Sequence, residues 1–490
     1  MMKLSNIIRD LPGVRHQQVK ADSEITSITH DSRSVSKGSL FIALNGLTVD
    51  GHHFIDQAIG AGATAIIYDD DQVQISGAEA ILVQNSRLAL PLVAANFYDH
   101  PEAKLSLIGI TGTNGKTTSN YFLQHLMNAS GRPTGRIGTT GADFHDLTID
   151  LIHTTPESSD LYAILDTFFQ NGAESATLEV SSHALAQNRV DGLSFKLAIF
   201  SNLTQDHLDY HESFEEYIAA KRLLFSNLHQ DAVALVNADD PNADAMLTSC
   251  PASVVSYGQS EKADYRIEAY RVSDIGTHVE LNTPQGSVHI ETNTVGLFNI
   301  YNLVSAFSAA LELDVDKNAL LQAAKNLPVV PGRLELMQNH APFKVFVDYA
   351  HTPDAMSTVL STLAEAYPSR KLITVFGCGG DRDKGKRPIM GEIATRLSTF
   401  SIITDDNPRT EAPLDIIHAI ADGCQGRMNY IVIQDRATAV ANALDRAEPG
   451  DIIAILGKGH EPYQEIMGER KPYSDMKVID QFMEQNGYTG

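Results

Sequence analysis

Short apolar runs alternate with helical patterns of hydrophobic and polar positions along most of the chain. Four such runs, at residues 105–108, 176–180, 197–200 and 232–236, have the length and composition of buried strands. Helical patterns separate them, and strands that alternate with helices build a parallel sheet with helices on both faces. The pattern therefore predicts an α/β domain in the middle of the chain.

The same alternation begins near the amino terminus. Apolar runs at residues 38–44 and 63–68 flank a helical pattern at 53–60, which predicts a small α/β unit. Within it, residues 31–33 read Asp-Ser-Arg, a polar segment that by itself indicates only a turn. We expect this unit to span residues 1–100.

The last part of the chain repeats the pattern. Residues 251–295 are expected to form a β-rich insertion, and residues 331–335 are expected to be the hinge into a further unit. Apolar runs then predict five strands, at residues 344–348, 372–376, 401–404, 430–433 and 451–456. The expected domains are therefore residues 1–100, 101–331 and 332–490.

A glycine-rich segment follows the first strand of the middle unit. Residues 109–118 read G-I-T-G-T-N-G-K-T-T and run into a helical pattern, which is the context of a phosphate-binding P-loop. Lys116 can reach the β- and γ-phosphates, and the Thr117 hydroxyl can bind Mg²⁺. Ile110 stands where the strict motif has its first glycine. An ordinary glycine turn is the alternative, but strand, Gly-Lys-Thr and helix together favour an ATP site.

Polar residues follow the next strands of this unit. Glu179 ends one strand, and Asn202 and His207 follow the neighbouring strand. Each alone is typical of a helix cap or a solvated group, but beside Lys116 they favour Mg²⁺ binding and phosphoryl transfer. Lys221 lies in a helical pattern, where lysines are usually solvated, and an ammonium cannot bind a metal.

Four strands of the last unit also end in polar or glycine-rich residues. These ends are residues 348–353, 377–383, 405–409 and 457–461. Ligands of open α/β sheets collect at the carboxyl ends of the strands. The sequence therefore predicts a doubly wound, ligand-binding unit.

Composition and charge narrow the class of protein. With 490 residues the chain can form about three domains, each with its own core. The formal charge of −24, from 37 basic and 61 acidic residues, argues against nucleic-acid or anionic-membrane binding. Three scattered cysteines fit a reducing cytosol, and neither a signal peptide nor a membrane span is apparent. We expect a cytoplasmic enzyme.

Ten segments in this order resemble the motifs of the Mur ligases, the ATP-dependent amino-acid-adding enzymes of peptidoglycan assembly. They are T-G-T-N-G-K-T-T, E-V-S-S-H, N-L-T-Q-D-H-L-D-Y-H, A-A-K, N-x-x-N, G-R-L-E, D-Y-A-H-T-P-D, G-C-G-G-D-R-D-K-G-K-R, D-D-N-P-R-T-E and G-K-G-H-E. The resemblance spans essentially the whole chain and is strongest for members that add meso-diaminopimelate. It implies an α/β fold with a uridine-binding N-terminal domain, a central P-loop ATPase-type domain and a C-terminal Rossmann-like, amino-acid-binding domain.

The resemblance also implies a reaction and its catalytic residues. ATP would phosphorylate the D-glutamate γ-carboxylate of UDP-N-acetylmuramoyl-L-alanyl-D-glutamate, and the amine of meso-diaminopimelate would attack the acyl phosphate. Lys116, Glu179, His207 and Lys221 are the implied catalytic residues. Mg²⁺ would be held by Thr117, Glu179, His207 and Lys221, the last as an N6-carboxylysine, which removes the objection to an ammonium. The protein is expected to be a monomer.

Three sets of binding residues are carried over in the same way. ATP is expected to contact Gly112, Thr113, Asn114, Gly115, Lys116, Thr117, Thr118, Asn302, Arg333, Asp348 and His351. The UDP-linked substrate is expected to contact His30, Ser32, Leu47, Thr48 and Val49 through its uridine end, and His153, Thr154, Thr155, Ser181, Gln187 and Arg189 through its muramoyl-dipeptide part. The amino acid is expected to contact Arg382, Asp406, Asn407, Pro408, Arg409, Gly457 and Glu461. His153 departs from the asparagine that the family has before its Thr-Thr pair.

Arg409 bears on which amino acid is added. Its guanidinium can bind a carboxylate through two hydrogen bonds, and diaminopimelate has one carboxylate more than lysine. Lysine-adding relatives lack this arginine, and Glu461 can accept the distant ammonium. Without the resemblance, a surface salt bridge would be the simpler interpretation of Arg409. The remaining alternatives are a lysine-adding homologue, a ligase like folylpolyglutamate synthetase, and a non-catalytic nucleotide-binding regulator.

Overall fold

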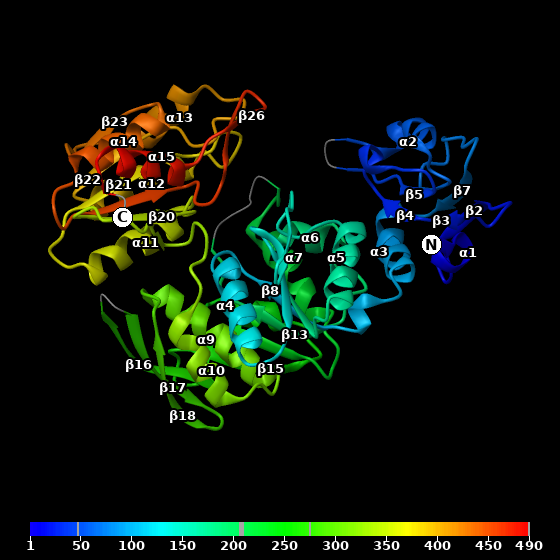
Figure 1. The fold of residues 1–490 in the computed structure, drawn as a ribbon, viewed down its shortest axis with the longest axis horizontal. Helices are drawn as coiled ribbons and strands as arrows, with labels where there is room; N and C mark the ends of the chain where they lie inside the picture. Colours follow the sequence, from blue (N-terminus) through cyan, green and yellow to red (C-terminus); the bar gives the residue numbers. More distant parts are fainter. Residues whose placement is uncertain (47–48, 205–209, 274–275, 489–490) are drawn as a thin grey trace.

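The computed structural model describes residues 1–46, 49–204, 210–273 and 276–488. Three units, each built on its own main sheet, follow one another along the chain (Figure 1). The blue N-terminal unit and the yellow-to-red C-terminal unit lie on either side of the cyan-to-green central unit. No helix in these described ranges combines the length and apolar character needed to cross a membrane.

The N-terminal unit has a five-stranded sheet in the order β2-β7-β6-β5-β4. Strands β4 to β7 pair in parallel, and β2 is antiparallel to β7. The strands are β2 (Val14–Gln18), β4 (Ser27–Thr29), β5 (Ser39–Ile42), β6 (Ala65–Tyr68) and β7 (Glu79–Val83), with the short pair β1 (Met2–Lys3) and β3 (Glu24–Ile25) beside them. The helices are α1 (Leu4–Ile7), α2 (Ile55–Ala61) and α3 (Ser86–Phe97).

The central unit has an eleven-stranded sheet in the order β11-β10-β9-β12-β8-β13-β14-β15-β16-β17-β18. Its strands are β8 (Ser106–Thr111), β9 (Thr134–Gly138), β10 (Gly141–Phe144), β11 (Leu147–Ile149), β12 (Ser175–Glu179), β13 (Phe195–Phe200), β14 (Val233–Asn237), β15 (Ser253–Gly258), β16 (Tyr265–Ser273), β17 (Gly276–Thr283) and β18 (Gly286–Thr292). Strands β9, β12, β8, β13, β14 and β15 pair in parallel. The β-rich segment is therefore not a separate insertion, because β15 continues the parallel sheet and β16 to β18 extend it.

Helices cover both faces of this sheet, as the alternating pattern predicted. They are α4 (Lys116–Ala129), α5 (Ser158–Gln170), α6 (Ser182–Ala186), α7 (Phe214–Ser226), α8 (Ala243–Leu247), α9 (Leu297–Glu312) and α10 (Lys317–Ala323). Ile108 and Ile110 of β8 pack with α4 and α9, whereas Leu107 packs on the other face with α5 and α7. Successive residues of the strand thus fill two cores. The P-loop strand is thereby fixed in the middle of the unit.

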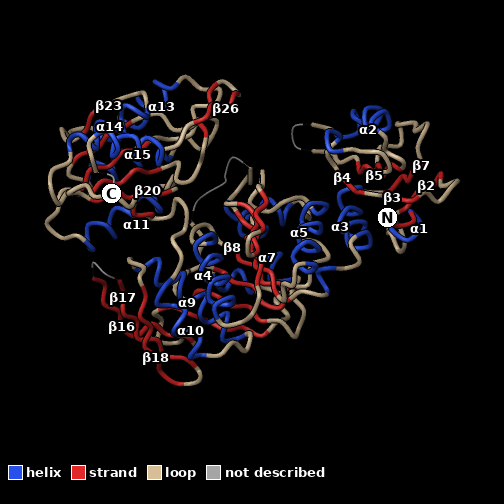
Figure 2. The backbone as a smooth tube through the Cα atoms, in the orientation of Figure 1, coloured by secondary structure: helices blue, strands red, loops and turns tan. Residues whose placement is uncertain are grey.

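The C-terminal unit has a six-stranded sheet in the order β19-β20-β24-β21-β22-β23. The strands are β19 (Glu335–Leu336), β20 (Lys344–Asp348), β21 (Leu372–Phe376), β22 (Phe400–Ile403), β23 (Tyr430–Val432) and β24 (Ile452–Leu456), followed by the hairpin β25 (Tyr463–Ile466) and β26 (Glu469–Pro472). Helices α11 (Pro353–Ala366), α12 (Lys386–Leu397), α13 (Pro413–Ala421), α14 (Arg436–Arg446) and α15 (Asp475–Gln485) complete the unit. Figure 2 shows helices on both sides of its strands.

The direction of the strands decides where the polar segments of the C-terminal unit meet. Strands β20, β24, β21, β22 and β23 all pair in parallel. The residues that follow β20, β21, β22 and β24 therefore emerge at one edge of the sheet. This is the arrangement that the four polar strand ends predicted.

Candidate active site

The P-loop joins β8 to α4 and holds its glycines against neighbouring polar side chains. Gly112 has φ +149° and Gly115 has φ +87°, which is backbone that favours glycine. A Cβ atom at Gly112 would overlap the Ser201 hydroxyl, and one at Gly115 would overlap the Asn302 amide oxygen. Glycine is therefore required at both positions by the backbone and by the packing.

Two lysines meet at this loop. Lys116 Nζ donates to the carbonyl oxygens of Gly112 at 2.8 Å and Thr113 at 2.9 Å. Lys221 Nζ, from α7, donates to the same Gly112 oxygen at 2.8 Å. Lys221 is 1% exposed and lies over the ring of Tyr217, so the interpretation of it as a solvated helix lysine is wrong. The fold brings two ammonium groups to one carbonyl oxygen.

Glu179 ends β12 beside these lysines and is completely buried. Its carboxylate accepts hydrogen bonds from Thr117 Oγ1 at 2.9 Å and from the backbone and hydroxyl of Thr139, both at 3.0 Å. Arg333 Nη2 donates to Thr117 Oγ1 at 3.3 Å from the hinge segment. Thr139 follows β9, the strand next to β12, and was not singled out from the sequence. No strand was predicted at residues 134–138, so no signal in the sequence pointed to Thr139.

A cleft of about 630 Å³ lies between the central and C-terminal units. Fourteen of the residues expected to bind ATP, metal or the UDP-linked substrate line it, namely Thr113, Asn114, Gly115, Lys116, Thr117, Thr118, Thr154, Glu179, Ser181, Lys221, Asn302, Arg333, Asp348 and His351. We call this space the nucleotide cleft. Among the described residues, no group of three or more His, Cys, Asp or Glu side chains is placed to hold a metal ion. His207 lies outside the described residues.

The C-terminal unit contributes a buried carboxylate to the nucleotide cleft. Asp348 accepts hydrogen bonds from the backbone of Leu334 at 2.6 Å and Ala350 at 2.7 Å. Burial raises the pKa of this carboxyl, although the Arg333 guanidinium and the two hydrogen bonds act in the opposite direction. Arg333 also lies over the ring of Tyr349, 4.8 Å from its centre. These contacts fix the hinge segment to the loop after β20.

A chain of hydrogen bonds connects the residues expected to hold the muramoyl-dipeptide. Arg189 donates to Gln187 Oε1 at 2.8 Å and to the carbonyl of Thr155 at 2.9 Å. The Thr155 hydroxyl donates to the Glu179 carbonyl at 2.8 Å, and the Ser181 backbone donates to Thr155 Oγ1 at 3.1 Å. The set is therefore joined to the strand end that carries Glu179.

The residues expected at the uridine end lie farther from this centre. His30 Nδ1 is 2.9 Å from Ser159 Oγ of α5, and Ser32 begins a short 3₁₀ helix. Val49 is 56% exposed. His153 belongs to the muramoyl-dipeptide set, and burial lowers its pKa. His30, Ser32, Val49 and His153 do not line the nucleotide cleft. Leu47 and Thr48 lie outside the described residues.

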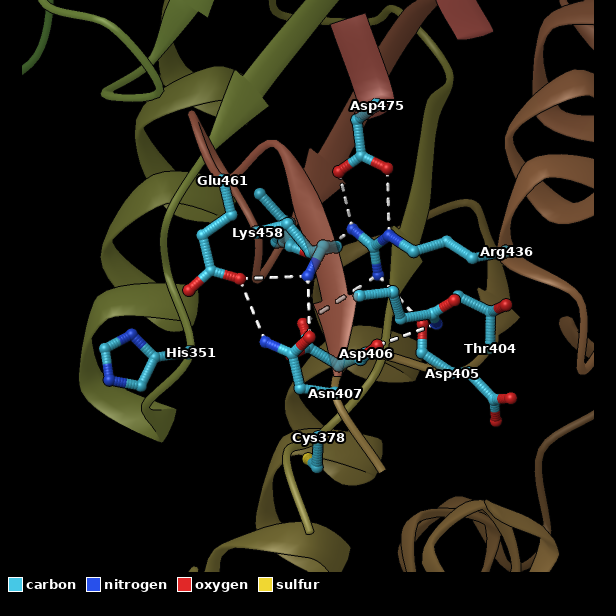
Figure 3. Close-up of polar contacts among 12 residues, drawn as sticks. His351, Cys378, Thr404, Asp405, Asp406, Asn407, Arg436, Lys458, Glu461 and Asp475 are labelled. Atoms are coloured by element: carbon cyan, nitrogen blue, oxygen red, sulfur yellow. Dashed lines mark hydrogen bonds and ion pairs between the residues drawn. The ribbon is translucent and has the colours of Figure 1, made fainter. Parts of the chain in front are cut away.

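A second cleft, of about 530 Å³, lies at the edge of the C-terminal sheet. Six of the seven residues expected to bind the amino acid line it, namely Arg382, Asp406, Asn407, Arg409, Gly457 and Glu461. We call it the amino-acid cleft. The seventh, Pro408, is buried, and its carbonyl abuts Gly380. Asp406, Asn407 and Glu461 lie close together at this edge (Figure 3).

Arg409 is held in a constrained conformation in the amino-acid cleft. It has φ +53°, and its Nη1 donates to the Gly380 carbonyl at 2.7 Å. Its Nε lies 3.6 Å from Glu465 Oε2, so an ion pair exists, but the side chain is only 21% exposed and lines the cleft. A Cβ atom on Gly379 would lie 2.8 Å from Arg409 Nη1. The glycine therefore makes room for the guanidinium.

The carboxylate of Asp406 is also placed for a charged ligand. Burial alone would raise its pKa, but the charges of Lys458 and Arg436 outweigh burial and lower it. Its Oδ2 atom is buried and has no hydrogen-bond partner in the structure. The side chain therefore stays ionised at neutral pH beside the amino-acid cleft.

The two clefts adjoin. Tyr349, His351 and Asp354, all in or just after the loop that follows β20, line both of them. Asn114 Nδ2 of the P-loop donates to Asp354 Oδ2 at 3.1 Å across the two units. Arg409 and Glu461 thus face a space that continues toward Lys116. The arrangement can hold a phosphorylated ligand and a zwitterion next to each other.

Several residues at these clefts were missed from the sequence. His183, Tyr349 and Asp354 line the amino-acid cleft, and Lys386 Nζ donates to the carbonyl of His351 at 2.9 Å. All four lie inside or beside the polar strand ends, so the motifs contained them. The sequence could not indicate which residues of each loop turn toward the space.

Models of three protein domains match most of this chain. They are described as "Mur ligase family, catalytic domain", over residues 24–98, "Mur ligase middle domain", over residues 110–310, and "Mur ligase, glutamate ligase domain", over residues 332–459. The chain therefore belongs to the Mur ligase family and is an ATP-dependent, amide-bond-forming ligase.

Individual relatives agree with this assignment over nearly their whole length. The UDP-N-acetylmuramoyl-L-alanyl-D-glutamate--2,6-diaminopimelate ligase of Geobacillus thermodenitrificans is 40% identical, over 97% of this chain and 98% of that protein. The enzyme of the same name from Bacillus cereus is 41% identical, over 97% of both chains. A solved structure of a ligase of that name is 33% identical, covers both chains fully and superimposes with a TM-score of 0.68.

Proposed function

We propose that this protein adds meso-diaminopimelate to the γ-carboxylate of D-glutamate in UDP-N-acetylmuramoyl-L-alanyl-D-glutamate, using ATP, during the synthesis of peptidoglycan precursors in the cytoplasm. The observation that carries the proposal is that Arg409 and Glu461 line the amino-acid cleft, which adjoins the nucleotide cleft. The names of relatives about 40% identical over nearly the full length support the same reaction.

The P-loop supplies the electrostatics of the first step. The reaction transfers the γ-phosphoryl group of ATP to the substrate carboxylate, and negative charge gathers where they meet. Lys116, whose ammonium lies 2.8 Å from the Gly112 carbonyl, would supply positive charge at this position, and Arg333 brings a guanidinium to within 3.3 Å of Thr117 Oγ1. Fixed cations at the site of developing charge stabilise such a transition state without reorganisation. The product is an acyl phosphate on the D-glutamate side chain.

The family implies Mg²⁺, and two side chains fit it. Glu179 offers a completely buried carboxylate, and Thr117 places its hydroxyl 2.9 Å from it. Hard oxygen donors of this kind are the ligands that Mg²⁺ takes beside phosphates. Bound there, the ion would neutralise charge on the phosphate oxygens. His207 is a further proposed ligand outside the described residues.

The position of Lys221 supports its proposed modification. The Lys116 and Lys221 ammonium groups repel each other, because each lies 2.8 Å from the same Gly112 oxygen, with Lys221 buried and Lys116 half-buried. Carboxylation of the neutral Lys221 amine by CO₂ forms a carbamate and releases a proton. The negative charge of the carbamate oxygens would attract the Lys116 ammonium, whereas the unmodified Lys221 ammonium repels it. The carbamate would also supply an oxygen donor near Glu179.

The amino-acid cleft explains the choice of diaminopimelate over lysine. Arg409 can pair with the second carboxylate of diaminopimelate, and Asp406 and Glu461 can accept the ammonium beside it. Lysine has no second carboxylate and would leave the guanidinium without a partner. Sites built on buried polar groups reject ligands that leave those groups unpaired. The remaining amine can then approach the acyl phosphate through the space shared by the two clefts.

An amino-acid panel tests the proposal directly. Purified protein is given ATP, Mg²⁺ and UDP-N-acetylmuramoyl-L-alanyl-D-glutamate, and ADP release is measured with meso-diaminopimelate, L-lysine or L-glutamate. We expect release that requires both the UDP-linked substrate and meso-diaminopimelate. A preference for lysine would identify a lysine-adding enzyme instead. Preference for glutamate would favour a folylpolyglutamate-synthetase-like ligase, and hydrolysis independent of any amino acid would favour a nucleotide-dependent regulator.

A further inference from the structure

Lys458 lies between two glycines in the turn that follows β24, and it is completely buried. Gly457 has φ +111° and Gly459 has φ +52°. A Cβ atom on Gly457 would lie 2.5 Å from Asp406 Oδ2, and one on Gly459 would lie 2.9 Å from the Gly332 carbonyl oxygen. Only glycine fits at either side, and the resulting turn directs the lysine into the protein.

The Lys458 ammonium contacts two residues of the amino-acid cleft but does not itself line it. Its Nζ atom donates to Asn407 Oδ1 at 3.0 Å and to Glu461 Oε2 at 2.9 Å (Figure 3). Both partners line the cleft, and Lys458 is not among its lining residues. Any effect of this lysine on a bound amino acid is therefore exerted through Asn407 and Glu461.

These contacts fix the orientation of the Asn407 amide. Its Oδ1 atom accepts hydrogen bonds from Lys458 Nζ and, at 2.9 Å, from the backbone N–H of Glu465. Because both partners are donors, the oxygen of the amide must point toward them. The Nδ2 group then points toward Glu461 and donates to its Oε2 atom at 2.9 Å.

The same contacts give the two carboxylate oxygens of Glu461 different partners. Oε2 accepts hydrogen bonds from Lys458 and Asn407, whereas Oε1 lies 3.5 Å from the Tyr349 hydroxyl. A completely buried ammonium is costly unless it is paired, and Lys458 is paired with Asn407 and Glu461 and lies 5.6 Å from the centre of the Tyr463 ring. Its positive charge also offsets one of the two neighbouring carboxylates, Asp406 and Glu461.

We propose that Lys458 is a positioning residue, which holds Glu461 and Asn407 so that Glu461 presents Oε1 to the ammonium group of the amino-acid substrate. The inference rests on the proposed function of the amino-acid cleft. It assigns to Lys458 a role in the affinity for the amino acid and none in the binding of ATP or of the UDP-linked substrate.

The first test is the steady-state kinetics of Lys458→Met, which removes the charge and keeps an unbranched side chain. We expect the KM for meso-diaminopimelate to rise by roughly 10- to 100-fold, the range for loss of a hydrogen bond to a charged group. The KM values for ATP and for the UDP-linked substrate should stay unchanged. Lys477→Met replaces an exposed lysine of α15 and serves as the matched control, with wild-type kinetics expected.

A double-mutant cycle separates positioning from general packing. Glu461→Gln is measured alone and together with Lys458→Met. Since the lysine acts through Glu461, the double variant should be little worse than Glu461→Gln alone. If the two losses multiply, or if Lys458→Met leaves the KM for meso-diaminopimelate unchanged, the inference is wrong.

Two further controls keep the outcome unambiguous. If Lys458→Met does not fold, Lys458→Arg takes its place, because it keeps the charge but cannot reproduce both contacts of a compact ammonium. A raised KM for meso-diaminopimelate alone then supports the inference, and an unchanged one overturns it. A wild-type protein that does not use meso-diaminopimelate would instead refute the proposed function of the cleft.

Discussion

Replacing Asp475 with alanine should destabilise the C-terminal unit strongly. Asp475 is the first residue of α15, and its carboxylate accepts hydrogen bonds from Arg436 Nε at 2.9 Å and Nη2 at 2.8 Å (Figure 3). Both side chains are completely buried. Burial alone would lower the pKa of Arg436, but the charge and the hydrogen bonds of Asp475, with smaller contributions from nearby groups, together outweigh burial and raise it. When Asp475 is removed, the guanidinium still stays charged at neutral pH, because the intrinsic pKa of arginine lies far above 7.

The expected magnitude follows from this burial. Breaking a buried ion pair by removing one partner costs about 3–5 kcal/mol, because the remaining charge has no compensation. One kcal/mol shifts the melting temperature of a unit of this size by about 2–4 °C, so the predicted fall is roughly 6–20 °C. Arg436 Nη2 also donates to the carbonyl of Leu456 at 2.9 Å. Leu456 directly precedes the turn that contains Lys458. Hydrogen exchange should therefore rise in α14, α15 and this turn.

The assay is thermal unfolding of the full-length protein, combined with hydrogen exchange that locates the weakened segment. Asp480→Ala on the exposed side of α15 is the matched control and should change stability by no more than about 0.5 kcal/mol. The double variant Arg436→Met with Asp475→Leu should recover most of the loss, since an apolar pair of similar volume can replace a buried ion pair. The reasoning would be refuted if Asp475→Ala lowered the free energy of unfolding by less than about 1 kcal/mol. It would also be refuted if the double variant were as unstable as Asp475→Ala.

Three further predictions concern the clefts and acid stability. Arg409→Ala should raise the KM for meso-diaminopimelate roughly 10- to 100-fold, because the second carboxylate of this amino acid would lose the guanidinium. The KM for the UDP-linked substrate should stay unchanged. An equal rise in both KM values would contradict this role of Arg409. Lys221→Ala should be nearly inactive and partly rescued by a small carboxylate such as acetate, and full activity without rescue would show that the carbamate is not needed. Arg387 lowers the pKa of Glu411 from 4.5 to about 2, so this pair stabilises the folded state above pH 4.5 and its contribution is lost as the pH falls toward 2. Glu411→Gln should remove that pH dependence from acid unfolding, and coincident unfolding curves for variant and wild type would contradict the assignment.

Much of the fold could be predicted because most strands of the parallel sheets are short, buried runs rich in apolar residues. Strands β20 and β21 begin and end at the predicted residues, and the P-loop lies between a strand and a helix as its motif requires. Parallel pairing then places four polar strand ends at one edge of the C-terminal sheet. The alternation of strands and helices in the sequence already implied this parallel pairing. The β-rich segment was assigned correctly as strands but not to its sheet, since a local pattern does not specify the neighbouring strand.

The parts that could not be predicted depend on contacts between distant residues. Lys221 has the pattern of an ordinary helix lysine, and only the approach of Gly112, more than a hundred positions earlier, shows why it is buried. Thr139 and Glu179 meet because β9 and β12 are neighbours in the sheet. Lys458 stands inside a recognised motif, but its inward direction depends on two glycine conformations and on the loop after β22.

The segment from Tyr349 to Asp354 forms a partial partition between the two adjoining ligand pockets, because Tyr349, His351 and Asp354 line both of them. It is anchored to both units, because it continues β20 and because Asp354 accepts a hydrogen bond from Asn114. A motion that shifts this partition must change both pockets together. A synthetic inhibitor made of two fragments, joined by a linker that passes over the partition, would turn two weak bindings into one strong one.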